Sequence, residues 1–204
     1  MNCDSFNTVR IYGLDFTSAP TKRKPITCAV CRLMDGVLNL EHSEAFSSFE
    51  GFEVFLNREG PWLAAVDAPF GQPRELIENL SWPETWEGYV KHLATLGKDG
   101  FIETVRAYKQ KRPKGQKEHK RQVDVLAKSI SPMKFSFVPV GRMFYQLAPR
   151  LESTGLNIPL LRPTNDSRVV VEAYPALIAR PFGPYKHDHV KKQVPKHLEA
   201  RRAI

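Results

Sequence analysis

The sequence predicts an α/β fold in which helices flank a mixed five-stranded sheet. Three β-rich segments follow one another near the start of the chain, and two apolar segments further on are each reached through helical sequence. Strands that follow one another directly form a meander, whereas strands reached through helices become neighbours by a crossover. The 204 residues suit one domain over residues 1–204, with a helical and basic-loop insertion at about 72–130.

The first half of the sheet is predicted from alternation and turn residues. Its three strands are expected at Val9–Phe16, at Pro25–Leu33 and from Val37 to Leu40. Asp35-Gly36 joins the second and third strands as a hairpin turn. A short amphipathic helix is expected at Phe49–Arg58, because apolar residues recur there near helical spacing.

Two later strands are apolar on both faces except for one acid each. They are predicted at Trp62–Ala68 and Arg168–Ala173. Such runs are typical of strands that helices cover on both sides.

Helices are predicted for most of the insertion and for the end of the chain. Ser81-Trp82-Pro83-Glu84 has the form of a capping box and predicts a helix that Gly97 ends. Asp99 is the expected N-cap of the next helix. Further helical segments are expected at Val123–Ser129, within Met143–Leu151, at Pro175–Arg180 and over the last dozen residues.

The formal net charge of +8 is concentrated in two segments. Lys109–Arg121 carries +6 and Arg180–Ile204 carries +5, which leaves −3 for the rest of the chain. Basic segments of this kind suit a polyanion, because each neutralised phosphate releases counterions. The alternative is a solvated loop and a solvated tail.

Several classes of protein are disfavoured. No apolar run approaches the roughly 20 residues that span a bilayer, and the N-terminus lacks a signal pattern. Three cysteines are too few for a disulfide framework, so a cytoplasmic location is expected. Cys28 and Cys31 form Cys-x-x-Cys without a second pair, and buried strand cysteines are the favoured interpretation. His187-Asp188-His189 has no further ligand nearby.

Three acids interrupt the most apolar strands: Asp15, Asp67 and Glu172. An ionised carboxylate in such a strand is costly unless it is paired, hydrogen-bonded or metal-bound. Ligand sites of open α/β sheets lie at the carboxyl ends of the strands. Clustered carboxylates suit Mg²⁺ or Mn²⁺, which can activate water against a phosphodiester. The alternative is that each acid caps a turn or pairs with an arginine.

At these segments the sequence resembles the DUF429 family of uncharacterised proteins, which are predicted nucleases with a ribonuclease H-like fold. The matching pieces are Gly13-Leu14-Asp15-Phe16 with Ser18-Ala19-Pro20, Gly60-Pro61-Trp62, Asp67-Ala68-Pro69-Phe70-Gly71, Ser131-Pro132-Met133-Lys134, Pro139-Val140-Gly141, Pro149-Arg150-Leu151 and Glu172-Ala173-Tyr174-Pro175. The resemblance implies a mixed five-stranded sheet with Asp15 on the first strand, Asp67 on the fourth and Glu172 on the fifth.

The sequence departs from the expected pattern in one respect. Ribonuclease H-like nucleases usually add an acid from a helix after the fifth strand, where this chain offers only Asp188 and Glu199. Either the chain is truncated, or Asp124 serves as the further metal ligand, or the site is incomplete.

Basic residues outside the two segments are candidates for binding phosphate. Lys134, Arg142 and Arg150 precede the last strand, and Lys114 and Arg121 belong to the basic segment. Arg121 and Asp124 could instead pair with each other, three residues apart on a helix. We therefore expect a metal-dependent nuclease that uses Mg²⁺ or Mn²⁺ and binds nucleic acid. The alternative is a non-catalytic nucleic-acid-binding or scaffold protein on the same fold.

Overall fold

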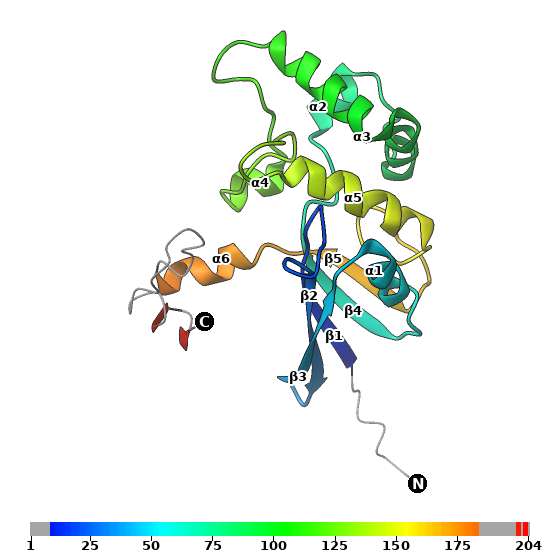
Figure 1. Cartoon of the computed structure of the whole chain (residues 1–204), viewed down its shortest axis with the longest axis vertical. Helices are drawn as coiled ribbons and strands as arrows, with labels where there is room; N and C mark the ends of the chain where they lie inside the picture. The colour runs from blue at the N-terminus through cyan, green and yellow to red at the C-terminus, as the bar shows by residue number, and fades with distance from the viewer. Residues whose placement is uncertain (1–8, 184–198, 201, 204) are drawn as a thin grey trace. The chain divides into compact units, whose positions relative to one another are not determined.

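The structure is a computed structural model that describes residues 9–183, 199–200 and 202–203. Its contacts divide the chain into two units, residues 1–172 and residues 173–204. The first unit contains a single five-stranded sheet in the order β3-β2-β1-β4-β5 (Figure 1). The prediction of an α/β fold with a mixed five-stranded sheet flanked by helices is confirmed.

The antiparallel half of the sheet is the predicted meander. It consists of β1 (Val9–Asp15), β2 (Ile26–Met34) and β3 (Val37–Phe46), with β2 between the other two. Asp35 and Gly36 have φ of 50° and 77°, the left-handed conformation that a tight hairpin turn requires. Nearly all of β3 is exposed, so the far part of this hairpin lies outside the core.

The parallel half consists of β4 (Trp62–Asp67) and β5 (Arg168–Glu172). β4 pairs in parallel with both β1 and β5, and it is central as predicted. Asp15, Asp67 and Glu172 are the last residues of β1, β4 and β5. The three acids therefore lie on the strands that the resemblance implies.

One face of the sheet packs on α1 (Phe49–Leu56), whose N-cap is Ser48. Aromatic rings fill this layer, and the Tyr12 and Phe55 rings meet edge to face with centroids 4.9 Å apart. On β4, buried residues alternate with half-buried ones. We expected both faces of β4 to be covered. Among the described residues only one face is fully buried, because Leu63 and Ala65 on the other face are half-buried.

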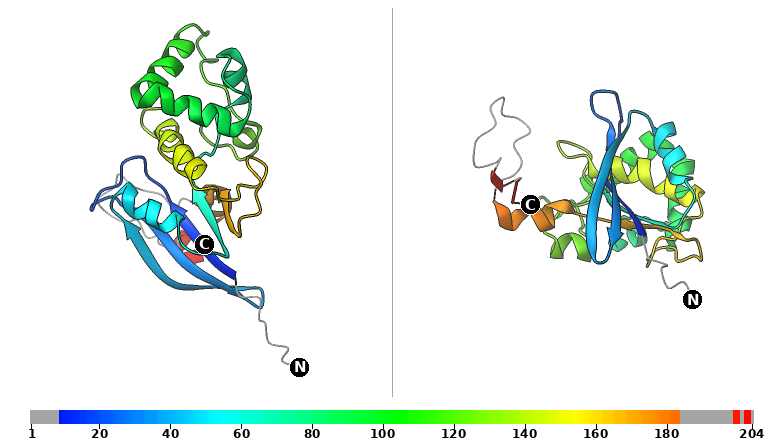
Figure 2. Two further views of the ribbon diagram at one scale, coloured as in Figure 1. Left: turned by 90° about the vertical axis from the view of Figure 1, so that its right-hand side faces the viewer. Right: turned by 90° about the horizontal axis from the view of Figure 1, so that it is seen from below.

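The insertion contains α2 (Arg74–Asn79), α3 (Trp86–Gln110) and α4 (Gln122–Leu126), and α5 (Val140–Ser153) follows it. α3 packs on α5, and α2 and α3 lie beyond α5 from the sheet (Figures 1 and 2). The sequence did not predict α2. The predicted start of α3 at Ser81 is wrong, because Thr85 is the N-cap and Ser81 has a φ of 51°. Gly97, with φ 70° and ψ 171°, interrupts α3 at the predicted position.

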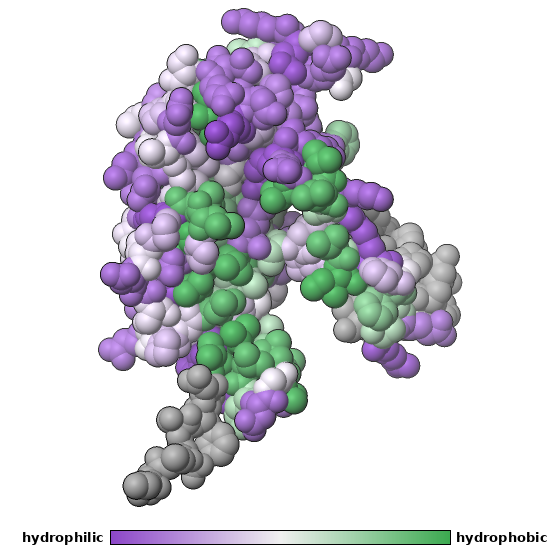
Figure 3. Space-filling model, turned by 180° about the vertical axis from the view of Figure 1, so that it is seen from behind, coloured by the Kyte–Doolittle hydropathy of each residue, from purple (hydrophilic) through white to green (hydrophobic). Residues whose placement is uncertain are grey.

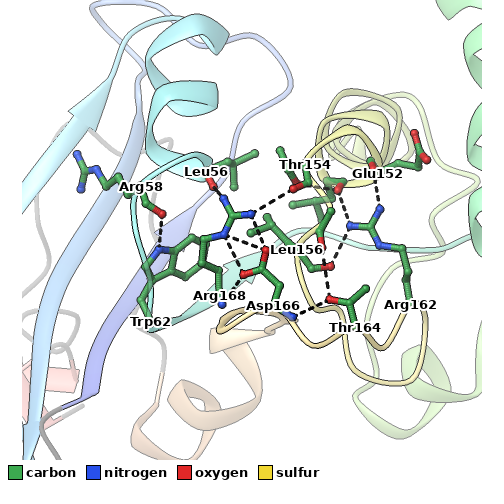
Figure 4. A network of polar contacts seen from close by, with 12 residues as sticks. Leu56, Arg58, Trp62, Glu152, Thr154, Leu156, Arg162, Thr164, Asp166 and Arg168 are labelled. Atoms are coloured by element: carbon green, nitrogen blue, oxygen red, sulfur yellow. Dashed lines mark hydrogen bonds and ion pairs between the residues drawn. The ribbon is translucent and has the colours of Figure 1, made fainter.

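Two arginines tie the end of α5 to the chain that leads into β5 (Figure 4). Arg162 is 8 % exposed, and its guanidinium donates to the carbonyls of Glu152, Leu151 and Leu156 at 2.6, 2.9 and 2.9 Å. Arg168 donates to the carbonyls of Leu56 and Thr154 and pairs with Asp166. Carbonyls at the end of a helix have no partner within the helix, so these contacts satisfy them.

The second unit begins with α6 (Pro175–Ala179) and the short 3₁₀ helix η1 (Arg180–Phe182), which agrees with the helical prediction for this segment. Residues 199–200 and 202–203 are helical. His187-Asp188-His189 and most of the basic tail lie outside the described residues. No helix in the described part of the chain is both long and apolar enough to cross a membrane.

Apolar side chains also reach the surface of the molecule (Figure 3). Those on the β2–β3 hairpin are Met34, Val37, Leu38 and Leu40, and those on α4 are Val123, Val125 and Leu126.

Candidate acidic site at the carboxyl edge of the sheet

Asp15 and Asp67 lie next to each other at the carboxyl ends of two parallel strands. They are register partners in the β1–β4 ladder, so their side chains leave the sheet on the same face. Asp15 is exposed and Asp67 is half-buried. The structure therefore brings together two of the three acids that the sequence singled out.

Glu172 occupies a different position relative to this pair. Its register partner in β4 is Val66, one residue before Asp67. Because successive residues of a strand point to opposite faces, Glu172 leaves the sheet on the other face from the two aspartates. Its carboxylate accepts a hydrogen bond from the backbone N–H of Phe70 at 2.8 Å.

Arg121 holds Glu172 by a two-pronged ion pair. Its two terminal nitrogens donate to the two carboxylate oxygens of Glu172 at 2.7 and 2.6 Å. The same guanidinium donates to Asp124 from Nε at 2.9 Å and from Nη2 at 2.7 Å. Bidentate pairs of this kind fix direction as well as charge. The predicted Arg121–Asp124 pairing is confirmed, and the structure adds Glu172 to it.

The ion pair between Arg121 and Asp124 is largely shielded from solvent. The side chains of Arg121 and Asp124 are 14 % and 2 % exposed, and Ser129 donates a further hydrogen bond to Asp124 at 2.9 Å. Burial raises the pKa of Asp124, but the hydrogen bonds and charge of Arg121 outweigh it, and the net pKa lies below its ordinary value. Burial likewise lowers the pKa of Arg121, and the two carboxylates more than offset this, so its pKa is raised. Both groups stay charged at neutral pH.

In the segment after β4, the backbone of Phe70 forms hydrogen bonds with side chains from two other elements. The backbone N–H of Phe70 donates to Glu172, and the carbonyl of Phe70 accepts from the Trp86 indole at 2.7 Å. Trp86 begins α3, so the insertion and β5 both hold the turn that follows Asp67.

These contacts decide which residues could hold a metal. Within the described residues, no group of three or more His, Cys, Asp and Glu side chains is placed to bind an ion. Glu172 and Asp124 are engaged by Arg121. Asp15 and Asp67 offer a pair of hard oxygen donors, and Mg²⁺ is commonly held by one or two carboxylates.

The predicted phosphate-binding residues are dispersed. Arg150 forms an ion pair with Glu53 at 2.9 Å and lies over the Phe49 ring, so it joins α5 to α1. Lys134 is half-buried in the loop before α5. Arg142 lines a small pocket that involves neither of these residues.

The base of the basic segment is attached to the fold, and its tip is exposed. Lys109 pairs with Glu118, and Lys120 donates to the carbonyl of Ser129 at 2.8 Å. The exposed cations of the tip are Lys111, Lys114 and Lys117. The alternative of a solvated loop therefore applies to the tip alone.

The cysteines of the Cys-x-x-Cys motif are buried and free, as the favoured interpretation predicts. Burial in β2, reinforced by nearby Glu44, raises the pKa of Cys28 to about 12. A protonated thiol is a poor metal ligand and nucleophile.

Sequence reasoning missed the partnership of Glu172 with Arg121, because the two residues are 51 positions apart. It also missed the contacts of Arg162, which lies between two predicted elements, and of Arg168, which begins the predicted fifth strand. Comparison with family models, curated proteins and solved structures finds no match for this chain.

Proposed function

We propose that this protein is a metal-dependent phosphodiesterase that cuts nucleic acid on a ribonuclease H-like fold. The observation that carries the proposal is the register pairing of Asp15 with Asp67 at the ends of β1 and β4. Two adjacent carboxylates at this edge form a donor set suited to Mg²⁺ or Mn²⁺. The sheet, with acids ending its first, fourth and fifth strands, supports the fold that the family resemblance implies.

A bound divalent ion would supply an activated water and stabilise the leaving oxygen of a phosphodiester. The chain's own residues would hold and orient the reactants. Asp15 and Asp67 would bind the ion. Glu172 acts as a positioning residue, because it holds the backbone of Phe70, three residues after Asp67.

The exposed tip of the basic segment would bind the strand backbone. Lys111, Lys114 and Lys117 are exposed and carry like charge. Lysines of this kind neutralise phosphates without reading the bases, which predicts binding with little sequence preference.

The test is cleavage of single-stranded, branched and RNA–DNA hybrid substrates with Mn²⁺ or Mg²⁺. Asp15→Asn and Asp67→Asn should each lower the rate by about a hundredfold or more, since even outer residues of metal sites cost 10–100-fold. Asp35→Asn is the matched control, because Asn tolerates the left-handed turn conformation that Asp35 adopts. Equal rates for the wild type and Asp15→Asn would contradict the proposal.

One observation favours a second candidate, a non-catalytic nucleic-acid-binding protein. Arg121 neutralises Glu172 and Asp124, so the described residues present a pair of acids where a larger set was expected. In that case binding would fall steeply with salt, and no divalent ion would produce turnover.

A further inference from the structure

A small pocket lies between the loop after β1 and the helices α3 and α5. Ser18 comes from the loop, Lys98 from α3, and Arg142, Tyr145 and Gln146 from α5. Its volume is about 50 Å³. None of these residues belongs to the Arg121 ion pair or to the two aspartates.

The polar residues that line the pocket suit an anion. Lys98 and Arg142 are cations, and no carboxylate lines the pocket. Asp99, which follows Lys98 in the chain, is an acid whose charge acts on Tyr145. The local charge of these three ionised side chains is therefore positive.

Arg142 carries a donor that the described part of the protein does not use. Its Nε atom is buried and has no hydrogen-bond partner. Buried polar groups almost always have a partner, so such an atom at a pocket calls for an explanation. Because Nε is covered, an anion in the pocket would be met by the terminal nitrogens of the Arg142 guanidinium, which carry further N–H donors.

Neighbouring groups add donors. The Oε1 atom of Gln146 accepts a hydrogen bond from Arg150 at 2.9 Å, which leaves its NH₂ group as the other arm of the amide. Burial, and then the charge of Asp99, raise the pKa of Tyr145, so its phenol keeps its proton at neutral pH. Ser18 contributes a hydroxyl that can donate as well.

Local backbone structure explains why Lys98 reaches this pocket. Gly97 interrupts α3 with a φ of 70°, a conformation that glycine adopts without a steric cost. The second helical segment therefore begins at Lys98, and its first turn lines the pocket with Lys98 and Ile102.

The size of the pocket limits what can enter. A single water needs roughly 10–15 Å³ of such volume, so this pocket has room for a group of a few heavy atoms. A phosphate group fits this description, whereas a nucleoside does not.

We propose that this pocket binds one phosphate group of the nucleic-acid strand, held by Lys98, Arg142 and Ser18. Ser18 follows Asp15 by three residues. A phosphate bound at Ser18 would therefore be separated from the acidic pair by only a short stretch of the protein chain. The assignment to nucleic acid rests on the proposed function, whereas the recognition of phosphate does not.

The first test measures binding of inorganic phosphate by calorimetry at low salt. Arg142→Gln should weaken binding by about tenfold or more, as expected for a hydrogen bond to a charged group. Lys98→Gln, at an exposed position that should tolerate the change, should weaken it by about threefold. Arg106→Gln, also exposed on α3, is the matched control and should bind like the wild type. The proposal is overturned if the wild type shows no saturable binding of phosphate, or if Arg142→Gln and Lys98→Gln both bind it as tightly as the wild type.

The second test distinguishes the sources of the phosphate. Oligonucleotides with a 5′-phosphate or a 5′-hydroxyl are compared in the wild type and in Lys98→Gln. A loss confined to the phosphorylated strand supports the pocket and identifies a terminal phosphate. An equal loss supports the pocket and identifies an internal one, and no loss with either strand overturns the assignment to nucleic acid. The Asp15→Asn variant separates the two proposals. If it binds phosphate and also cuts nucleic acid as fast as the wild type, the phosphate pocket is supported and the proposed function is contradicted.

Discussion

Arg121 lies between two carboxylates that come from different parts of the chain. Asp124 is three residues away in α4, and Glu172 ends β5. The buried guanidinium holds the pKa of Asp124 below its ordinary value, and it orients the Glu172 carboxylate, which accepts from the backbone N–H of Phe70. Register already puts Glu172 on the other face of the sheet from the aspartate pair, and at the scale of single residues the contact with Arg121 gives it a positioning role.

Removing the buried acid should destabilise the fold in a pH-dependent way. Asp124→Asn should lower the free energy of unfolding at pH 7 by about 3 kcal/mol, because it leaves the Arg121 charge less well paired. The native pKa of Asp124 lies below its ordinary value, so its contribution is complete above about pH 4 and is lost as the pH falls through the native pKa.

Urea denaturation at pH 7 and pH 3 checks this prediction. The difference between wild type and Asp124→Asn should shrink at pH 3, with Asp35→Asn as the exposed control. A difference that stays constant between the two pH values would show that the Asp124 charge adds nothing to stability.

At the scale of elements, two signals near the start of α3 compete. Ser81 has the sequence of a capping residue, but the helix begins after Thr85, whose hydroxyl accepts from the N–H of Gly88 at 3.2 Å. Ser81 instead adopts a left-handed turn after α2. The capping motif misled because the helix is capped by Thr85, which has Gly88 three residues later and therefore lacks the Glu or Gln of a capping box.

Substitution at the two positions should separate these roles. Thr85→Ala should lower the free energy of unfolding by about 1 kcal/mol through loss of the cap. Ser81→Gly should be neutral or slightly stabilising, because glycine adopts a positive φ without strain. Thermal unfolding of the two variants measures the contrast, and a larger loss from Ser81→Gly would place the cap at Ser81 after all.

Arg162 donates hydrogen bonds to backbone carbonyls at the C-terminal end of α5. Among the described residues, it is the one donor to the carbonyls of Glu152 and Leu156, and it adds a donor to Leu151. Arg162→Met should therefore lower the free energy of unfolding by about 2–4 kcal/mol, since it leaves the carbonyls of Glu152 and Leu156 unpaired. Arg106→Met, exposed on α3, should have little effect in the same chemical denaturation series. Equal stability of the two variants would remove this role from Arg162.

At the scale of the whole molecule, the charge divides into separate parts. The cations at the base of the basic segment are used in internal contacts, and only its tip presents free lysine side chains. The lysines that this segment presents to a partner without an internal contact are therefore those of its tip, Lys111, Lys114 and Lys117.

Neutralising the tip should change how nucleic-acid binding depends on salt. A triple variant with Lys111, Lys114 and Lys117 each changed to Gln should reduce the slope of log K against log salt by about 2–3, one for each lost phosphate contact. Fluorescence anisotropy over a salt series measures the slope, with Lys91→Gln as a single-charge control on α3. An unchanged slope would mean that the tip is only solvated.

The sequence by itself determined the features that depend on near neighbours. Alternating and continuous apolar runs located all five strands, Asp35-Gly36 and Gly97 marked the turn and the helix break, and Arg121 with Asp124 formed a pair within one helical turn. These signals are local, because side-chain periodicity and backbone preference act over a few residues.

Only the tertiary structure decided how the predicted residues combine. The register of β1 and β4 set Asp15 beside Asp67, and the register of β5 placed Glu172 one position away, where Arg121 reaches it. Packing of α3 and α5 against the loop after β1 formed the pocket of Ser18, Lys98 and Arg142. A shift of one residue in register reverses the face of a side chain without changing the hydrophobic pattern that predicts the strand, so strand pairing, rather than composition, chose the pair of acids.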